Sequence, residues 1–170
     1  MKGFQLTFFT IEGRHHGRES MGHWIMDQAK ALGVKGATLT VDGVLIDGVA
    51  ERVARLASVL RIHVLTGDTF GTAAAALAGL PCDVRVLRAA GQADAKRDYV
   101  ATLTADAVAC VGNGRNDRLM MEAAALAIAV VQSEGACLET LAAADVVAPH
   151  IGDALDLLLH PMRLTATLRS

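Results

Sequence analysis

Short apolar segments alternate with amphipathic stretches along most of this chain. Apolar runs of that length are typical of buried strands, and apolar residues three or four positions apart are typical of helices. The pattern predicts strands at 61–66, 82–87, 107–112, 127–131 and 145–149, and helices at 48–60, 72–80, 92–103, 117–125, 136–143 and 152–160. In the helix at 48–60, the expected buried positions are Val49, Val53, Leu56 and Leu60. Such alternation predicts an α/β fold with a doubly wound parallel sheet, covered by helices on both faces.

The beginning of the chain has a different composition. Four of the six aromatic residues lie within the first 24 positions, whereas the chain after residue 38 is rich in Ala, Val, Leu and Gly. The first part reads as a strand at 3–9, a helix at 20–33 and a second strand at 36–41. We therefore predict an N-terminal strand-helix fragment over 1–37 and a main domain over 38–170.

Charge, hydropathy and cysteine content exclude several classes of protein. A net charge of −2 offers no concentrated basic face, so we expect no nucleic-acid partner. The longest apolar-rich stretch, 119–131, contains Glu122 and is too short to span a bilayer, so we expect no membrane association. Three widely spaced cysteines suit thiols in a reducing compartment better than disulfides or a zinc site. The expectation is a soluble cytoplasmic protein.

Residues with chemical potential follow two of the predicted strands. In parallel α/β sheets, function resides in the loops at the carboxyl ends of the strands. The strand at 61–66 leads into Thr66-Gly67-Asp68, and the strand at 107–112 leads into the Gly-rich turn GNGRND at 112–117. Lys96 lies on the helix before that second strand. A hydroxyl, backbone N–H groups and a lysine suit phosphate oxygens, and an aspartate with an amide oxygen suits Mg²⁺.

These two motifs resemble those of a known superfamily. TGD at 66–68 and GNGRND at 112–117 look like the hinge and magnesium motifs of P-type ATPase phosphorylation domains. Over residues 38–169, the order VDGVLIDGV, VLTGDTFGTA, GNGRNDRLMM and ALDLLL is similar to the soluble P-type-ATPase-like branch of the haloacid dehalogenase superfamily. The resemblance implies a Rossmann-like fold without a large cap domain. It also implies a Mg²⁺-dependent phosphohydrolase that acts on a phosphorylated small molecule.

The resemblance also implies roles for individual residues. Thr66 would bond the phosphoryl group, Lys96 would stabilise a phosphoaspartyl intermediate, and Asp117 would bind Mg²⁺ as the cofactor. Asn113 stands where an aspartate is usual, and its neutral oxygen should weaken Mg²⁺ binding. The implied phosphate contacts are Thr66, Gly67, Lys96 and Asn116, and the implied metal ligands are Asn113 and Asp117.

The first motif of the superfamily is altered in this chain. Related enzymes carry Asp-x-x-Gly-Thr-Leu at the end of the first strand, and its aspartate is the nucleophile. Aligned on Thr38-Leu39, this chain has Val34 at that position, and a valine cannot attack phosphorus. Asp42, at the carboxyl end of the 36–41 strand, is the remaining candidate nucleophile.

The N-terminal fragment offers an explanation for this loss. Residues 1–39 resemble the opening strand, helix and second strand of the PII-like domain of unknown function 190 family. We infer a fusion in which this fragment replaced the start of the phosphatase strand and removed its nucleophile.

Each candidate residue also has an ordinary structural interpretation. Asp47, Asp68 and Asp117 precede helices and could be N-caps. Asp42-Gly43 is a standard turn pair, and Lys96 alone could be a solvated helix lysine.

Two functions therefore stay open. The first is a phosphohydrolase of low activity, with Asp42 as nucleophile or general base. The second is a non-catalytic phosphate- and Mg²⁺-binding module, which could form a homo-oligomer through the exposed edge of its N-terminal strand.

Overall fold

A six-stranded sheet forms the centre of the molecule, with strand order β5-β4-β1-β6-β7-β8. The computed structural model describes residues 8–10, 40–41, 44–67, 75–88, 90–103, 105–133 and 135–169. The strands of the large sheet are β1 (Phe8–Thr10), β4 (Arg61–Thr66), β5 (Asp83–Val86), β6 (Val108–Gly112), β7 (Leu126–Val130) and β8 (Val146–Ala148). A separate two-stranded sheet contains β2 (Thr40–Val41) and β3 (Val44–Leu45).

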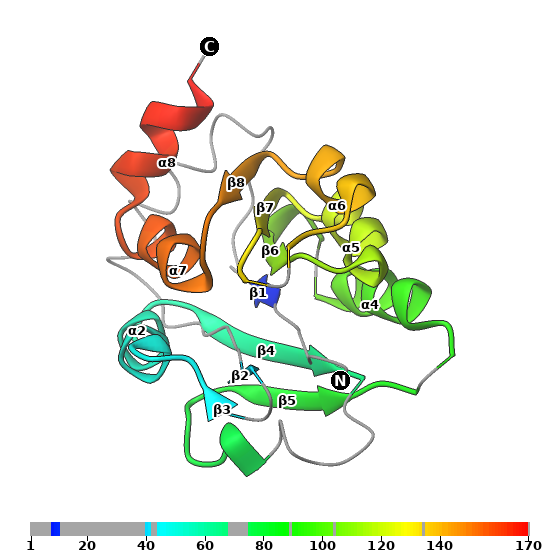
Figure 1. The fold of residues 1–170 in the computed structure, drawn as a ribbon, viewed down its shortest axis with the longest axis horizontal. Helices are drawn as coiled ribbons and strands as arrows, with labels where there is room; N and C mark the ends of the chain where they lie inside the picture. The colour runs from blue at the N-terminus through cyan, green and yellow to red at the C-terminus, as the bar shows by residue number, and fades with distance from the viewer. Residues whose placement is uncertain are drawn as a thin grey trace.

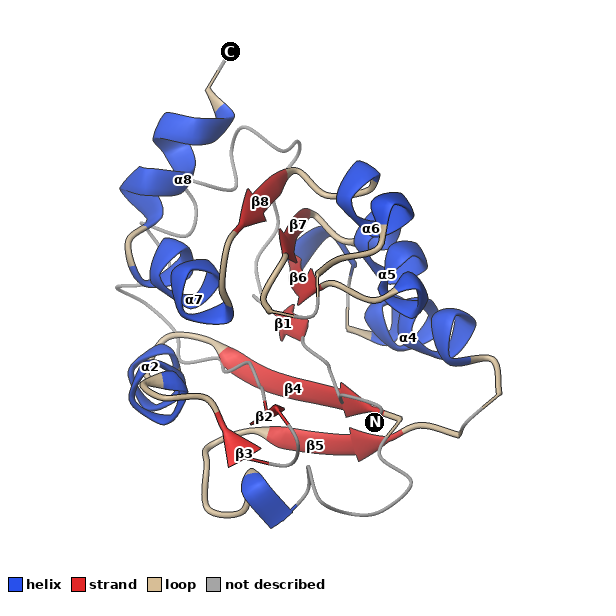
Figure 2. Ribbon diagram, viewed as in Figure 1, coloured by secondary structure: helices blue, strands red, loops and turns tan. Residues whose placement is uncertain are grey.

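Helices lie on both sides of the large sheet (Figure 1). On one side are α4 (Gln92–Thr102), α5 (Arg118–Ala123) and α6 (Leu138–Ala142). On the other are α2 (Val49–Leu56), α7 (Ile151–Leu159) and α8 (Pro161–Leu168). Short 3-10 turns, η1 (Ala105–Ala107) and η2 (Arg115–Asp117), precede β6 and α5. Figure 2 shows the resulting layers, and the predicted α/β class is confirmed.

The prediction of an all-parallel sheet is wrong at its central strand. β4 and β5 are parallel, as are β6, β7 and β8, but β1 is antiparallel to both of its neighbours. Phe8 is paired with His63 of β4 and with Cys110 of β6. The pattern of apolar residues indicates which strands are buried but not the direction in which they run. It therefore could not distinguish a parallel β1 from an antiparallel one. The N-terminal strand thus lies inside the large sheet and has a neighbour on each side.

This central position bears on the expected self-association. Both hydrogen-bonding edges of residues 8–10 are occupied, by β4 and by β6. An unpaired edge, the physical basis for that expectation, is therefore absent at these described residues. Homo-oligomerisation stays a prediction, but it is no longer supported by a free edge at residues 8–10.

Residues 40–41, which we assigned to the second strand at 36–41, lie in the small sheet and not in the large one. Val41 is paired with Val44, and Thr40 with Leu45, in antiparallel register. Asp42 itself lies outside the described residues, as do Val34 and the predicted helix at 20–33.

The hydrophobic core follows the predicted pattern closely. The four apolar positions expected on the first helix of the main domain are all buried, although α2 ends earlier than predicted, at Leu56. Every residue of β6 and β7 is buried, and so is every residue of β4 after Arg61. The core therefore lies on both sides of the large sheet.

A further helix follows the one predicted at 152–160. That predicted helix is α7, which ends at Leu159, and Pro161 then begins α8. Proline fits the first turn of a helix because its missing N–H is not needed there. In the part of the chain that the structure describes, no helix is long and apolar enough to cross a membrane.

Candidate functional site

The two motif-bearing loops open at the same edge of the large sheet. β4 and β6 run in the same direction, and β1 lies between them. Thr66 and Gly112, their last residues, are therefore about 10 Å apart across two strand spacings. Thr66 is buried, and its carbonyl oxygen accepts a hydrogen bond of 2.6 Å from the amide of Leu87. The strands that lead into the two motifs therefore end at the same edge of the large sheet.

A buried ion pair lies beside this edge. Lys96 Nζ is 2.6 Å from Asp117 Oδ1, and the two side chains are 1% and 0% exposed. The alternative that Lys96 is a solvated helix lysine is therefore wrong. Helix α4 turns this side chain inward, toward the 3-10 turn that contains Asp117. Such burial is costly for both charges, because each loses its water.

The second oxygen of Asp117 holds the loop that precedes it. Asp117 Oδ2 accepts hydrogen bonds from the backbone amides of Asn113, at 3.0 Å, and Gly114, at 2.9 Å. Asp117 does occupy the N-cap position of helix α5, as the structural alternative expected, but its side chain makes no capping hydrogen bond to that helix. A Cβ atom at Gly112 would lie 2.5 Å from the same Oδ2. The first glycine of GNGRND is therefore needed because the carboxylate occupies the space beside it.

Asn113 connects the loop to the segment before α6. It is 3% exposed, and its Nδ2 donates to the Gly135 carbonyl at 3.1 Å. Its own carbonyl accepts from the amide of Cys137 at 2.8 Å, and Thr140 Oγ1 donates to the Gly114 carbonyl at 2.7 Å. Asn113 thus has a clear anchoring role beside Asp117.

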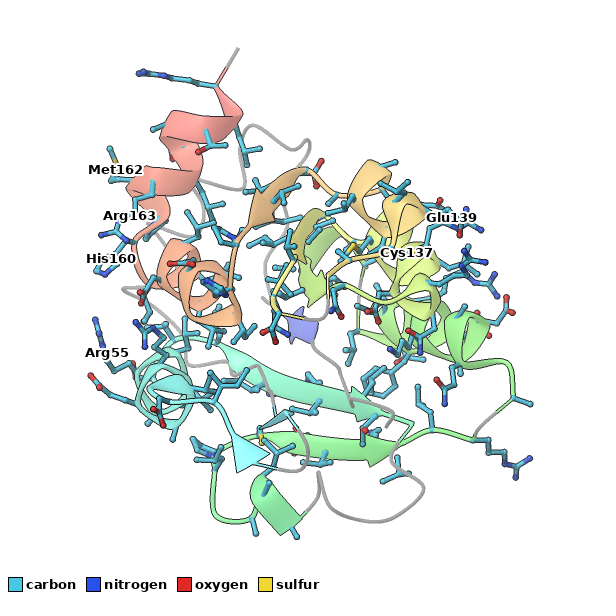
Figure 3. All side chains as sticks on the ribbon, viewed as in Figure 1. Arg55, Cys137, Glu139, His160, Met162 and Arg163 are labelled. Carbon is cyan, nitrogen blue, oxygen red and sulfur yellow. The ribbon has the colours of Figure 1, made fainter. Side chains whose placement is uncertain are left out.

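The outer rim of the loop is exposed to solvent. Figure 3 shows Cys137 and Glu139 near the start of α6, on the outer side of the molecule. Arg115 Nε lies 3.5 Å from Glu139 Oε2, with both side chains more than half exposed. Within the sheet behind the loop, burial raises the pKa of the Cys110 thiol well above its ordinary value. That thiol is therefore neutral, and all three cysteines are free.

Gln92, which the sequence analysis did not single out, connects the two motif loops. Its Oε1 accepts a 2.7 Å hydrogen bond from Asn116 Nδ2, in the GNGRND loop. A Cβ atom at Gly67, in the TGD motif, would lie 2.1 Å from Gln92 Nε2. Gln92 lies one helical turn before Lys96 on α4, and this spacing was the available signal, because it places both side chains on one helix face.

The side chains that the structure describes at this site are poor ligands for Mg²⁺. Mg²⁺ prefers carboxylate oxygens together with phosphate and water. Both oxygens of Asp117 already accept N–H donors, one of them a cation, and among the described residues no three His, Cys, Asp or Glu side chains could hold a metal ion. Asp42 and Asp68 lie outside the described residues. Mg²⁺ binding therefore stays an expectation from the resemblance.

The structure brings six of the predicted site residues to one edge of the large sheet. Lys96, Asp117 and Asn113 are linked directly, and Asn116 is linked to Gly67 through Gln92. Thr66 precedes Gly67 at the end of β4. Asp42 lies outside the described residues.

Comparison with known proteins gives a relative without an assigned activity. No family model matches the chain, and no solved structure matches it. An uncharacterized protein from the archaeon Methanocaldococcus jannaschii is 47% identical over 62 residues, which cover 36% of this chain and 67% of that protein. Over that segment this chain belongs to the same family as the archaeal protein.

Proposed function

We propose that this protein is a degenerate phosphohydrolase-like domain of the haloacid dehalogenase type. It binds a phosphoryl group of a small molecule at the carboxyl edge of the sheet, without the usual phosphoaspartate chemistry. The observation that carries the proposal is the buried Lys96–Asp117 pair beside the ends of β4 and β6.

The hydrogen-bonding capacity of Lys96 supports an anionic ligand. An ammonium group carries three N–H donors, and Asp117 Oδ1 is the acceptor that Lys96 reaches within the described residues. Buried donors are stabilised when an acceptor fills the space next to them, and oxyanions are the strongest acceptors for a charged donor. The Thr66 hydroxyl group, at the end of β4, belongs to the same edge.

The direction of the central strand supports loss of the nucleophile. β1 is antiparallel to β4 and β6, so its carboxyl end, at Thr10, lies at the edge opposite to Thr66 and Gly112. A phosphoaspartate can form only if a carboxylate attacks phosphorus at the phosphate site. Among the described residues, Asp117 is the buried carboxylate at this edge, and hydrogen bonds engage both of its oxygens. These observations favour binding over turnover.

A phosphate-release assay tests the loss of activity. The full chain is incubated with a general phosphomonoester in Mg²⁺ or in EDTA, alongside Asp42→Asn and Asp117→Asn. Asp156→Asn serves as a carboxylate control away from the site, because Asp156 pairs with Arg52 between α2 and α7. We expect equal, background release from all four proteins in both conditions.

Other outcomes of this assay contradict the proposal in different ways. Mg²⁺-dependent release by the native chain that is lost in Asp42→Asn would make the protein an active phosphohydrolase with a relocated nucleophile. Release that is lost only in Asp117→Asn would indicate attack by water, with Asp117 in the catalytic machinery. Circular dichroism of each variant establishes that it is folded.

A further inference from the structure

The Gln92 side chain lies between the two motif loops, and the residues it contacts belong to both of them. Asn116 Nδ2 donates to Gln92 Oε1 from the GNGRND loop. The other end of the same amide, Nε2, packs directly over Gly67. Lys96 is one turn further along α4, where it is buried against Asp117.

The hydrogen bond from Asn116 determines which end of the Gln92 side-chain amide faces a ligand. Because Oε1 is the acceptor for Asn116, Nε2 is the end that lies at the Gly67 turn. A primary amide nitrogen carries two N–H donors. The Asn116 amide, by contrast, uses its own nitrogen on Gln92. Gln92, more than Asn116, therefore offers donors next to the TGD turn.

A neutral donor suits this position electrostatically. Lys96, whose ammonium group lies 2.6 Å from Asp117, already places one buried cation on this face of α4. An amide contributes hydrogen bonds to an oxyanion without placing another cation in a partly buried position, where desolvation would be costly.

We propose that Gln92 is a direct ligand of a tetrahedral phosphate oxyanion, through Nε2, and that Asn116 is a positioning residue that orients the Gln92 amide. This inference rests on the proposed function, since it names a further residue of the same site. It replaces the direct phosphate contact that the sequence resemblance implied for Asn116.

Calorimetric titration of the full chain with inorganic phosphate tests this assignment. The proteins compared are the native chain, Gln92→Ala, Asn116→Ala and the double variant. Loss of a hydrogen bond to a charged ligand corresponds to about a ten- to hundredfold weaker Kd, expected for Gln92→Ala. Asn116→Ala should weaken binding less, and should have no further effect once Gln92 is alanine. Gln92→Glu, which places a carboxylate beside the anion, should weaken binding more than Gln92→Ala.

Gly67→Ala provides a readout that a purely structural role of Gln92 would not produce. The new Cβ would occupy the position of Gln92 Nε2, and the flexible end of that side chain would have to move away. Phosphate binding should therefore weaken when Gln92 is present, and the effect of Gly67→Ala should be smaller in the Gln92→Ala background. Thermal unfolding of each variant shows whether the site has been lost through unfolding.

The outcomes separate the two proposals. If the native chain binds phosphate and Gln92→Ala binds it equally well, the role of Gln92 is wrong and the phosphate site stands. If Asn116→Ala weakens binding equally with and without Gln92, Asn116 is itself the ligand and the positioning role is wrong. If the native, folded chain does not bind phosphate, the proposed function and the role of Gln92 are both wrong.

Discussion

Two ion pairs of similar length hold different parts of this molecule together. Lys96 and Asp117 meet at 2.6 Å at the carboxyl edge of the sheet, and the side chains are 1% and 0% exposed. Arg52 and Asp156 meet between helices α2 and α7 through two hydrogen bonds of 2.9 Å, and the side chains are 29% and 24% exposed. The second pair keeps partial contact with water, whereas the first has almost none.

The difference in burial indicates different roles. Hydrogen bonding to Asp156 raises the pKa of Arg52, and hydrogen bonding to Arg52 lowers the pKa of Asp156, so this pair is stabilised by its own contacts. A fully buried pair is weak evidence for stability, because desolvation offsets much of the attraction. The position of Lys96 and Asp117 beside two motif loops instead favours a role in ligand binding.

The largest expected effect comes from breaking the buried pair on one side. Lys96→Met would leave the Asp117 carboxylate buried without its cation, and we expect a loss of about 3–5 kcal/mol in the free energy of unfolding. The double variant Lys96→Met, Asp117→Asn should recover part of this loss, since no charge is then left unpaired and the asparagine oxygen can still accept from the Asn113 and Gly114 amides. Urea unfolding of the three proteins measures both values. If Lys96→Met is as stable as the native chain, the pair is not buried in the way the structure shows.

Gly112→Ala should have the next largest effect. The new Cβ would lie 2.5 Å from Asp117 Oδ2 and 2.6 Å from its Cγ, and this short buried side chain has little room to move. We expect a loss of about 1–3 kcal/mol, as for other overpacked sites. Gly152→Ala in α7 is the matched control, because its nearest contact would be an ordinary 3.7 Å. Equal stability of the two variants in urea would contradict this account of the GNGRND turn.

The pH dependence of stability should report on a buried histidine between the sheet and α4. His63 is 5% exposed, its Nδ1 lies 2.9 Å from the Tyr99 hydroxyl group, and its Nε2 has no hydrogen-bond partner among the described residues. Burial lowers the pKa of His63 below 6.5, against the opposing effect of Asp83. The unfolded chain therefore takes up this proton first as the pH falls.

The sign of the effect follows from that difference in pKa. The stability from His63 is fully present above pH 6.5 and is lost as the pH falls toward the lower folded pKa, by at most about 1.4 kcal/mol per pH unit. Unfolding free energies at about pH 7.5 and about pH 5.5 should differ more for the native chain than for His63→Gln. An identical difference in both proteins would rule out His63 as the origin.

The smallest effect is expected for the half-buried pair. Arg52→Met should reduce stability by about 0.2–1 kcal/mol, because water remains near both partners and screens their attraction. A double-mutant cycle with Asp156→Asn isolates the coupling between the two side chains. High salt should reduce this coupling. If the coupling free energy between Arg52 and Asp156 equals the loss of unfolding free energy in Lys96→Met, the two ion pairs do not differ in the proposed way.

The sequence was sufficient to predict five strands of the large sheet, β4 to β8, and the core of the main domain. The apolar spacing of the helix predicted at 48–60 identified four positions that are all buried, and the strand expected at 61–66 has those bounds in the structure. Periodicity works here because these elements are buried on one or both faces. The sequence also identified the residues of the carboxyl edge, since strand ends and glycine turns leave local signals.

Features that depend on long-range pairing could not be predicted in this way. The antiparallel direction of β1 depends on its pairing with β4 and β6, which are distant in sequence. The role of Gln92 depends on two loops that meet only in the folded chain. The burial of Lys96 depends on Asp117, which lies 21 residues away.

The most direct test of the account compares phosphate binding by two folded proteins, the native chain and the double variant Lys96→Met, Asp117→Asn, which keeps an acceptor for the loop amides. The double variant removes the buried charges without leaving either one unpaired. Titration with inorganic phosphate should show saturable binding by the native chain and none by the double variant. Equal binding by both proteins, or no binding by either, would contradict the claim that this ion pair marks a phosphate site.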